Sequence, residues 1–139
     1  MDINEILKRY ATGERNFKGV NLIGTSLREI NLSGANLQEA SFSEANLSKA
    51  ELVGINLREA SLSMANLAEA NLSAANLDGA NLSGANLRGA NLSRENLKMA
   101  NFTQADLSGA NLQGASIWAA SLTAAKLQGT IMPDGTTHD

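Results

Sequence analysis

Large apolar residues recur at every fifth position along most of the chain. They run without interruption from Phe17 to Leu127 and define 23 five-residue units, in which this central position is Leu 19 times. A second apolar position lies two residues earlier and is Ala in 17 units. The remaining positions are polar or small, so two of every five side chains are suited to burial.

A period of five matches neither an amphipathic helix nor a continuous alternating strand, whose periods are 3.6 and 2. Each Ala-Asn-Leu segment instead alternates in, out and in, like three residues of a strand, and the next two residues turn the chain. Ten of the twelve glycines lie at the second position after the centre, where a tight turn requires a positive φ. Many units carry Glu, Lys, Met or Gln there, so we expect only some corners to be of the glycine-requiring type.

The repeated unit Ala-Asn-Leu-x-Gly is clearest between Ala80 and Leu92. It resembles the motif of the pentapeptide-repeat family over residues 15–129. The resemblance implies an all-β solenoid, a right-handed quadrilateral parallel β-helix with four units per coil and nearly six coils. Residues 7–17 are also similar to small cyanobacterial members of the family. One face of such a coil would stack a structural core made of Phe17, Leu37, Leu57, Leu77, Leu97 and Ile117.

The residues outside the repeats suggest a cap at each end of a single domain spanning 1–139. Apolar residues at helical spacing in segment 2–12 predict a capping helix that begins after Asp2, ends at Gly13 and covers the first coil. A helix lying on a membrane surface is disfavoured, because acids and bases balance on its polar side. After the repeats, Pro133 should stop further coils, so we expect a lid over residues 130–134 and a disordered tail over 135–139. The helical stripe consists of Ile3, Ile6, Leu7 and Tyr10.

Charge argues against a nucleic-acid partner and against imitation of DNA. Residues 15–129 contain nine acidic and nine basic residues, and the net charge of −3 lies in the ends. A protein that binds phosphates by charge needs a basic excess or stripe. Some pentapeptide-repeat proteins are thought to bind DNA gyrase by imitating acidic duplex DNA, and a neutral repeat surface disfavours that activity here.

The sequence also predicts no membrane span, no disulfide and a cytoplasmic location. Cysteine is absent, and no window approaches 18 consecutive apolar residues. The first residues lack a basic start followed by an apolar run, the pattern of a signal peptide.

No arrangement of residues points to catalysis or to a cofactor. The single histidine, His138, lies in the polar tail, and neither metal-ligand spacing nor a phosphate-binding glycine motif occurs. We therefore expect no enzyme activity, no cofactor and no metal. A ladder of Ser and Thr after the centres of one face admits ice or carbohydrate binding, but short hydroxyls also suit close vertical packing. The abundant Asn residues are expected to stack along the coil edges.

One candidate interaction surface emerges from stacking, which makes residues twenty apart vertical neighbours. Trp118 lies one coil above Lys98, and Met99 lies below Ala119, which places an apolar spot near the C-terminal end. Tryptophan is enriched at binding hot spots. The favoured alternative is that the tail, through Ile131 or Met132, covers Trp118.

Glu95 is the one acid at an inward position. An unpaired buried carboxylate is costly, so we expect Glu95 to be turned outward or paired with Arg94 or Lys98.

Together these patterns predict a non-catalytic scaffold that binds an unidentified protein. The alternative is a gyrase-binding modulator of topoisomerase activity, and an enzyme is the least favoured reading. No nucleic-acid or membrane partner is expected, and a monomer is favoured over an end-to-end dimer.

Overall fold

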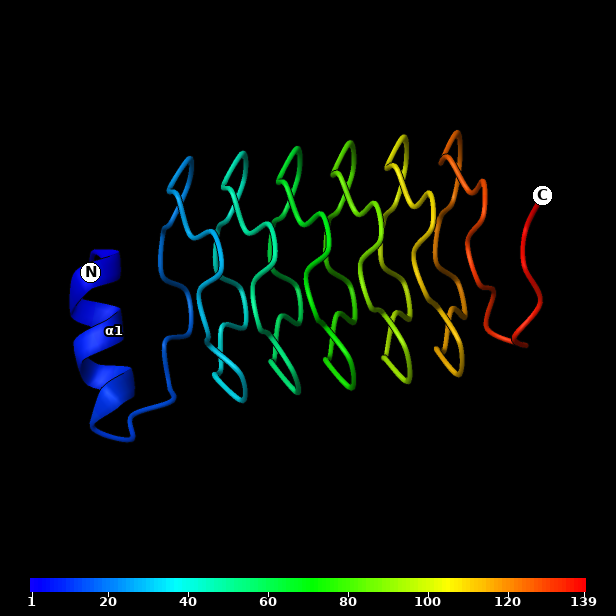
Figure 1. Ribbon diagram of the computed structural model, residues 1–139. Coiled ribbons are helices and arrows are strands. Elements are labelled where there is room, and N and C mark those ends of the chain that lie inside the picture. Colours follow the sequence, from blue (N-terminus) through cyan, green and yellow to red (C-terminus); the bar gives the residue numbers. More distant parts are fainter.

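The computed structural model describes all residues, 1–139, and shows one short helix followed by a regular stack of coils (Figure 1). The helix α1 spans Ile3–Ala11 and lies across the first coil. Parallel bridges join residues twenty apart, from Asn16 with Asn36 to Asn111 with Ile131. Four five-residue units therefore complete one coil, as the family resemblance implies.

The sides of the coils are shorter than strands. Each side contributes one residue, usually Asn, to isolated parallel bridges. At the first of these, the amide of Asn36 donates to the carbonyl of Arg15 (2.7 Å), and the amide of Phe17 donates to the carbonyl of Asn36 (2.8 Å). The expected three-residue strands are not present, because the chain turns immediately after each centre. The coils nevertheless keep parallel β pairing along the whole stack.

All 23 corners have a positive φ at the second residue after the centre. This residue has a positive φ whether it is glycine or not, as in Glu39 (62°), Met64 (60°) and Ala74 (58°). A positive φ at the third residue of a four-residue turn is the type II pattern. The expectation that only some corners need this conformation is therefore wrong. Pairing between coils holds it in place: the Glu39 amide, for example, donates to the Arg58 carbonyl of the next coil (2.9 Å).

The asparagines act mainly within their own corners. In most units the Asn side-chain oxygen accepts a hydrogen bond from the amide two residues later, as Asn56 does from Arg58 (3.0 Å). This Asx turn fixes the start of the corner. Only Asn36 with Asn16, at 3.3 Å, forms an amide–amide bond between coils. The predicted Asn ladder is thus largely replaced by local caps of the turns.

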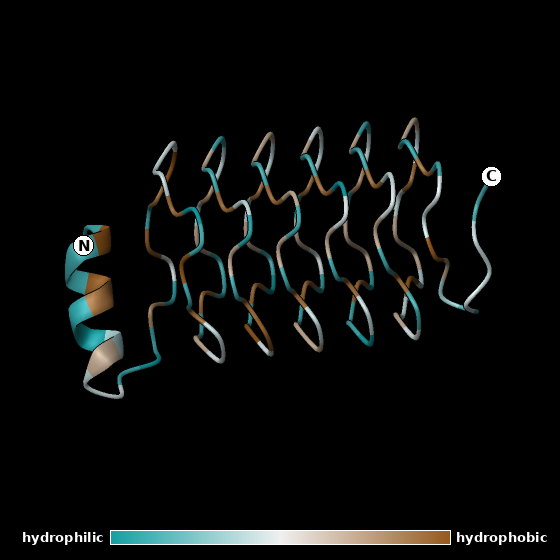
Figure 2. Ribbon diagram, in the orientation of Figure 1, coloured by the Kyte–Doolittle hydropathy of each residue, from teal (hydrophilic) through white to brown (hydrophobic).

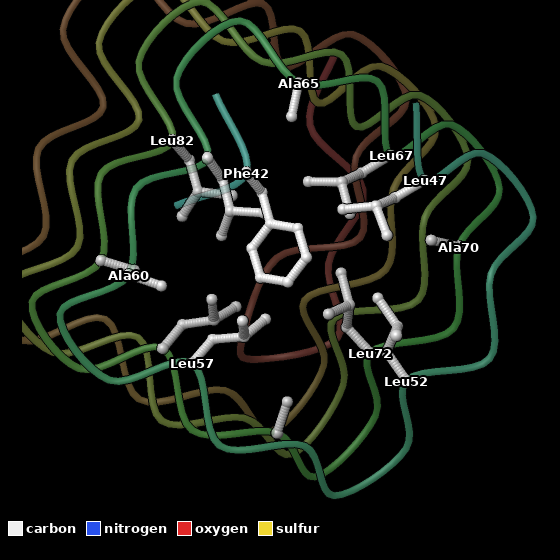
Figure 3. Packing of buried hydrophobic residues seen from close by; sticks show 14 of the residues in the cluster. Phe42, Leu47, Leu52, Leu57, Ala60, Ala65, Leu67, Ala70, Leu72 and Leu82 are labelled. Atoms are coloured by element: carbon white, nitrogen blue, oxygen red, sulfur yellow. The ribbon is translucent and has the colours of Figure 1, made fainter. Parts of the chain in front are cut away.

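The inward positions form one continuous apolar core. It contains 37 buried residues, almost all of them central Leu or Phe residues and the Ala residues two positions earlier. Figure 2 shows apolar and polar residues alternating along each coil, and Figure 3 shows Phe42, Leu47, Leu52 and Leu57 meeting in the interior. Of the predicted core column, Phe17, Leu37, Leu57, Leu77 and Leu97 are buried. Ile117 is only partly buried because no further coil covers it.

Helix α1 is capped at both ends as the sequence suggests. The Asp2 side chain accepts from the Glu5 amide (2.9 Å). Gly13, with a φ of 101°, ends the helix, since its amide donates to Tyr10 and the amide of Glu14 donates to Arg9. These two bonds are a Schellman motif.

Three of the four predicted apolar residues of α1 face the first coil. Ile6 is fully buried, and Ile3 and Tyr10 pack partly against the core. Leu7 is 39% exposed, so its inclusion in the buried stripe is wrong. The Tyr10 hydroxyl also donates to the carbonyl of Ser33 (2.7 Å). With nine residues, α1 is too short and too polar to cross a membrane.

The C-terminal residues fold back on the stack rather than extending as the expected disordered tail. Ile131 continues the parallel ladder, since the Leu112 amide donates to its carbonyl (2.7 Å). The chain then reverses, and Thr137 pairs antiparallel with Ile131. His138 bonds through its amide to Thr130 (2.8 Å) and through its carbonyl to the Gly129 amide (2.8 Å). This hairpin covers one side of the last coil.

Candidate interaction surface

The two predicted neighbours of Trp118 lie beside it at one corner of the last coils. We call Met99, Trp118 and Ala119 the Trp118 surface. The Met99 amide donates to the Trp118 carbonyl (2.9 Å), which holds the two units in register. Trp118 is 70% exposed and Met99 is 59% exposed, and Ala119 is exposed as well. The stack therefore presents two large apolar side chains to solvent on a backbone that is fixed by hydrogen bonds.

The tail does not cover Trp118. It pairs with residues 129–132 on another side of the coil, where it contacts Ile131 and Thr130 through backbone bonds. The expectation that Ile131 or Met132 folds over Trp118 is wrong, because the hairpin turns back along its own side instead of crossing the end of the stack.

The Trp118 surface adjoins an incompletely covered layer of the core. Ile117, Leu122 and Leu127 are only partly buried, and we call these three residues the open end. Their amides have no hydrogen-bond partner in the molecule, whereas the equivalent amides one coil earlier each donate to the last coil. An apolar layer with unpaired backbone groups can accept further protein. The sequence signal for it was the absence of any second helix after the repeats.

Candidate metal ligands are not clustered in the structure. No group of three His, Cys, Asp or Glu residues is close enough to hold a metal ion. His138 is exposed in the tail. The two surface depressions lie elsewhere, one over the polar face of α1 and one beside Arg88 and Ser108.

Some hydroxyls of the ladder bond to one another or to neighbouring hydroxyls. The Ser43 hydroxyl lies 2.8 Å from that of Ser61 and 3.1 Å from that of Ser63. Thr103 and Ser121 are similarly linked at 3.4 Å. These internal bonds support the interpretation that short hydroxyls serve vertical packing.

Glu95 is buried directly beneath the last coil. The amide of the next residue, Asn96, donates to the carbonyl of Ala75 in the coil below. The carbonyl of Glu95 accepts from the amide of Ser116 in the coil above. The residue is 2% exposed, and neither carboxyl oxygen has a hydrogen-bond partner. It is thus neither turned outward nor paired with Arg94 or Lys98, and both expectations are wrong. Burial raises the pKa of the Glu95 carboxyl well above its ordinary value.

The corner at Glu95 is also irregular. In every other unit, the amide three residues after the centre donates to the carbonyl of that centre. This bond is missing between Glu95 and Leu92. The neighbouring Arg94 still has a positive φ of 55°. Accommodating a carboxyl group in a position built for a methyl group therefore costs this corner its closing hydrogen bond.

The stacked coils define a repeat solenoid built from five-residue units, four to a coil. The family model described as pentapeptide repeats (8 copies) matches residues 16–54, 55–94 and 100–134. The chain belongs to this family.

The chain is also similar to solved structures. A pentapeptide repeat protein from the thylakoid lumen of Arabidopsis thaliana is 32% identical, over 81% of this chain and 72% of that protein, with a TM-score of 0.55. The pentapeptide repeat protein Rfr23 from the cyanobacterium Cyanothece 51142 is 30% identical over 99% of this chain and 100% of its own, with a TM-score of 0.48. QnrB1, a plasmid-mediated fluoroquinolone resistance protein, is 21% identical over 84% of this chain and 64% of its own, with a TM-score of 0.53. A comparison with curated proteins gives no match.

Proposed function

We propose that this protein is a non-catalytic interaction scaffold that binds another protein through the Trp118 surface. The observation that carries the proposal is the 70% exposure of Trp118, the single tryptophan, beside the exposed Met99. Leaving large apolar side chains in water is unfavourable unless a partner covers them. Hydrogen bonds between coils fix the backbone beneath both residues, so little order would be lost on binding.

The partner that fits this surface is a protein with an apolar contact of its own. By register, the charged residue Lys98 lies one coil below Trp118. A small apolar centre with a polar rim is the usual anatomy of a protein interface. The proposal includes neither a nucleic acid nor a membrane as partner.

Affinity capture from the source cell tests the proposal. The wild-type protein is compared with Trp118→Ala, and Ile23→Ala is the matched control. Ile23 occupies the same position in its unit and is 55% exposed, but it lies near the other end of the stack. We expect a protein that the wild type and Ile23→Ala retain and Trp118→Ala loses. Equal capture by all three would contradict the assigned surface.

Gyrase binding is the alternative, and the charges continue to disfavour it. The repeats carry equal numbers of acids and bases, and a likeness to QnrB1 at 21% identity concerns the fold alone. A gyrase supercoiling assay separates the two functions: the scaffold predicts no effect on supercoiling.

Several finer expectations belong to the same proposal. A right-handed, four-sided stack of nearly six coils is what family membership implies. We also propose a monomer over an end-to-end dimer, and the open end makes this choice worth testing directly. The cytoplasmic location stays a prediction, since one relative comes from the thylakoid lumen.

A further inference from the structure

Glu95 is the only acidic or basic residue that is buried, and it lies near the C-terminal end of the stack. By register it is between Ala75 below and Ala115 above, with Leu92 and Leu97 on its own coil. All four are buried and apolar. A carboxylate in such surroundings has no source of compensation, so the group is tolerated there only with its proton.

No charged side chain is available to stabilise the ionised form in place. Arg94 and Lys98 flank Glu95 on its own coil, but both are exposed at outward positions, and neither forms an ion pair with it. The coil below contributes Asp78, which also points outward and bears the same charge as an ionised Glu95. The unit above, residues 115–119, contains no charged residue, and Asp134 of the tail is exposed.

The coils on the N-terminal and C-terminal sides of Glu95 differ in how much structure must open before water reaches the carboxyl group. On the N-terminal side the coils continue down to α1, which covers the first of them. On the C-terminal side only residues 96–139 follow, and they finish at the open end with a layer that is partly exposed and unpaired. Because each coil contacts only its neighbours, opening can be confined to one side. The missing bond between Glu95 and Leu92 already weakens the corner where this side begins.

We propose that Glu95 is a proton-controlled latch for the C-terminal coils: with its proton it lies closed in the core, and on losing the proton it opens residues 96–139 away from the rest of the stack. Opening brings the carboxylate into water and releases one proton to solvent. The segment that moves contains the whole Trp118 surface, although the latch does not depend on that surface binding a partner.

Hydrogen exchange measured by mass spectrometry on the full chain tests the latch. Wild type, Glu95→Gln and Glu95→Ala are compared at about pH 5 and about pH 7, after correction for intrinsic exchange. If one proton is released, the opening of peptides from 96–139 increases by up to about tenfold per pH unit in wild type. Peptides from 20–75 are expected to show no such change. Neither variant can ionise at this position, so both should give a flat response.

The control is Glu44→Gln, which removes an exposed carboxyl group at an outward corner. It should retain the wild-type response in 96–139. A wild-type change below about twofold across the two pH units would overturn the latch, because linkage requires a larger one. The same holds for an equal response in Glu95→Ala, or for an equal rise in peptides 20–75, which would indicate global rather than local opening. Since Ala is the usual residue at this position, Glu95→Ala keeps the test valid even where the Gln variant folds poorly.

Discussion

Single inward residues carry the stability of this stack, and Leu77 is the clearest case. It is fully buried near the middle of the core, with coils on both sides. Leu77→Ala should lower the free energy of unfolding by about 2–5 kcal/mol, because the neighbouring coils are held apart by their ladder and cannot fill the cavity. Chemical denaturation measures this loss, and Leu7→Ala, at a 39% exposed position on α1, is a control with a smaller effect. A loss below about 0.5 kcal/mol would contradict the packing of Leu77 in the core.

Glu95 makes stability depend on pH in the direction opposite to that of a salt-bridged acid. Burial raises its pKa in the folded protein well above its ordinary value of 4.5. The unfolded chain therefore releases this proton at a pH at which the folded chain still holds it. The stability contributed by the protonated form is complete below about pH 4.5 and is lost as the pH rises toward the folded pKa, at about 1.4 kcal/mol per unit.

Glu95→Ala should remove this dependence. We expect the variant to be as stable as wild type or more stable, with an advantage that grows with pH over the same window. Denaturant unfolding at several pH values measures it. Parallel curves for the two proteins would show that Glu95 does not hold its proton in the folded state.

Trp118 gives a direct optical test of its exposure. Because 70% of the residue is in contact with solvent, acrylamide should quench its fluorescence strongly. Removal of residues 133–139 should leave the quenching unchanged, since the hairpin lies on another side of the coil. Strong protection in a monomeric protein would mean that the tail covers Trp118 after all.

At the scale of the element, each five-residue unit is a corner whose backbone conformation the ladder imposes. Leucine spacing and the inward Ala predicted which residues are buried, because burial follows directly from the period. The corner conformation could not be predicted in the same way. Glutamate, methionine or alanine at a position such as Ala74 does not favour a positive φ, so the sequence suggested two kinds of corner. Bonds to the neighbouring coils outweigh this local preference at every unit.

Substitutions at two corners measure the free-energy cost of the positive φ. Gly109 has a φ of 71°, and an added Cβ there would have no atom closer than 4.0 Å. Gly109→Ala should therefore lose about 1–2 kcal/mol from the left-handed conformation alone, without a steric clash. Ala74→Gly is the reverse change at a φ of 58° and should be stabilising or neutral. Thermal unfolding of both variants checks the pair, and stabilisation by Gly109→Ala would contradict the assignment.

Only part of the candidate surface could be predicted from the sequence. The positions of Met99, Trp118 and Ala119 followed from the twenty-residue register, which the family resemblance supplied. The exposure of Trp118 did not follow, because it depends on where residues 130–139 go, and a non-repeating segment has no register. The sequence singled out Glu95, but its buried and unpaired state was not predicted for a related reason: a rule about the cost of one buried charge cannot show that the surrounding ladder keeps the residue in place.

For the whole molecule, the ends decide whether the stack remains single. α1 covers the first coil, whereas the hairpin protects only one side of the last. Deletion of residues 130–139 should remove Ile131 from the ladder and free the amides of Leu112 and Gly114. The enlarged open end should raise self-association, because unpaired edges and apolar layers recruit other chains.

Sedimentation velocity of the full-length and truncated proteins measures this effect. A full-length monomer that associates after truncation agrees with a protective hairpin. A full-length dimer that dissociates after truncation would instead mean that the hairpin forms the contact between copies. Deletion of residues 136–139 removes the pairing of Thr137 with Ile131 but leaves Ile131 in the ladder, so it shows whether the returning segment alone protects the end.

The equivalence of the four sides has a consequence for changes in chain length. Removing five residues from the middle of the stack would preserve every inward and outward position, yet it would rotate all later residues by a quarter turn. Residues that are now vertical neighbours on one side of the stack would then lie on two different sides. Removing twenty residues would leave each column intact and shorten the stack by one layer. The distance between α1 and Trp118, and the side on which Trp118 emerges, can thus be varied independently of each other by choosing the number of units.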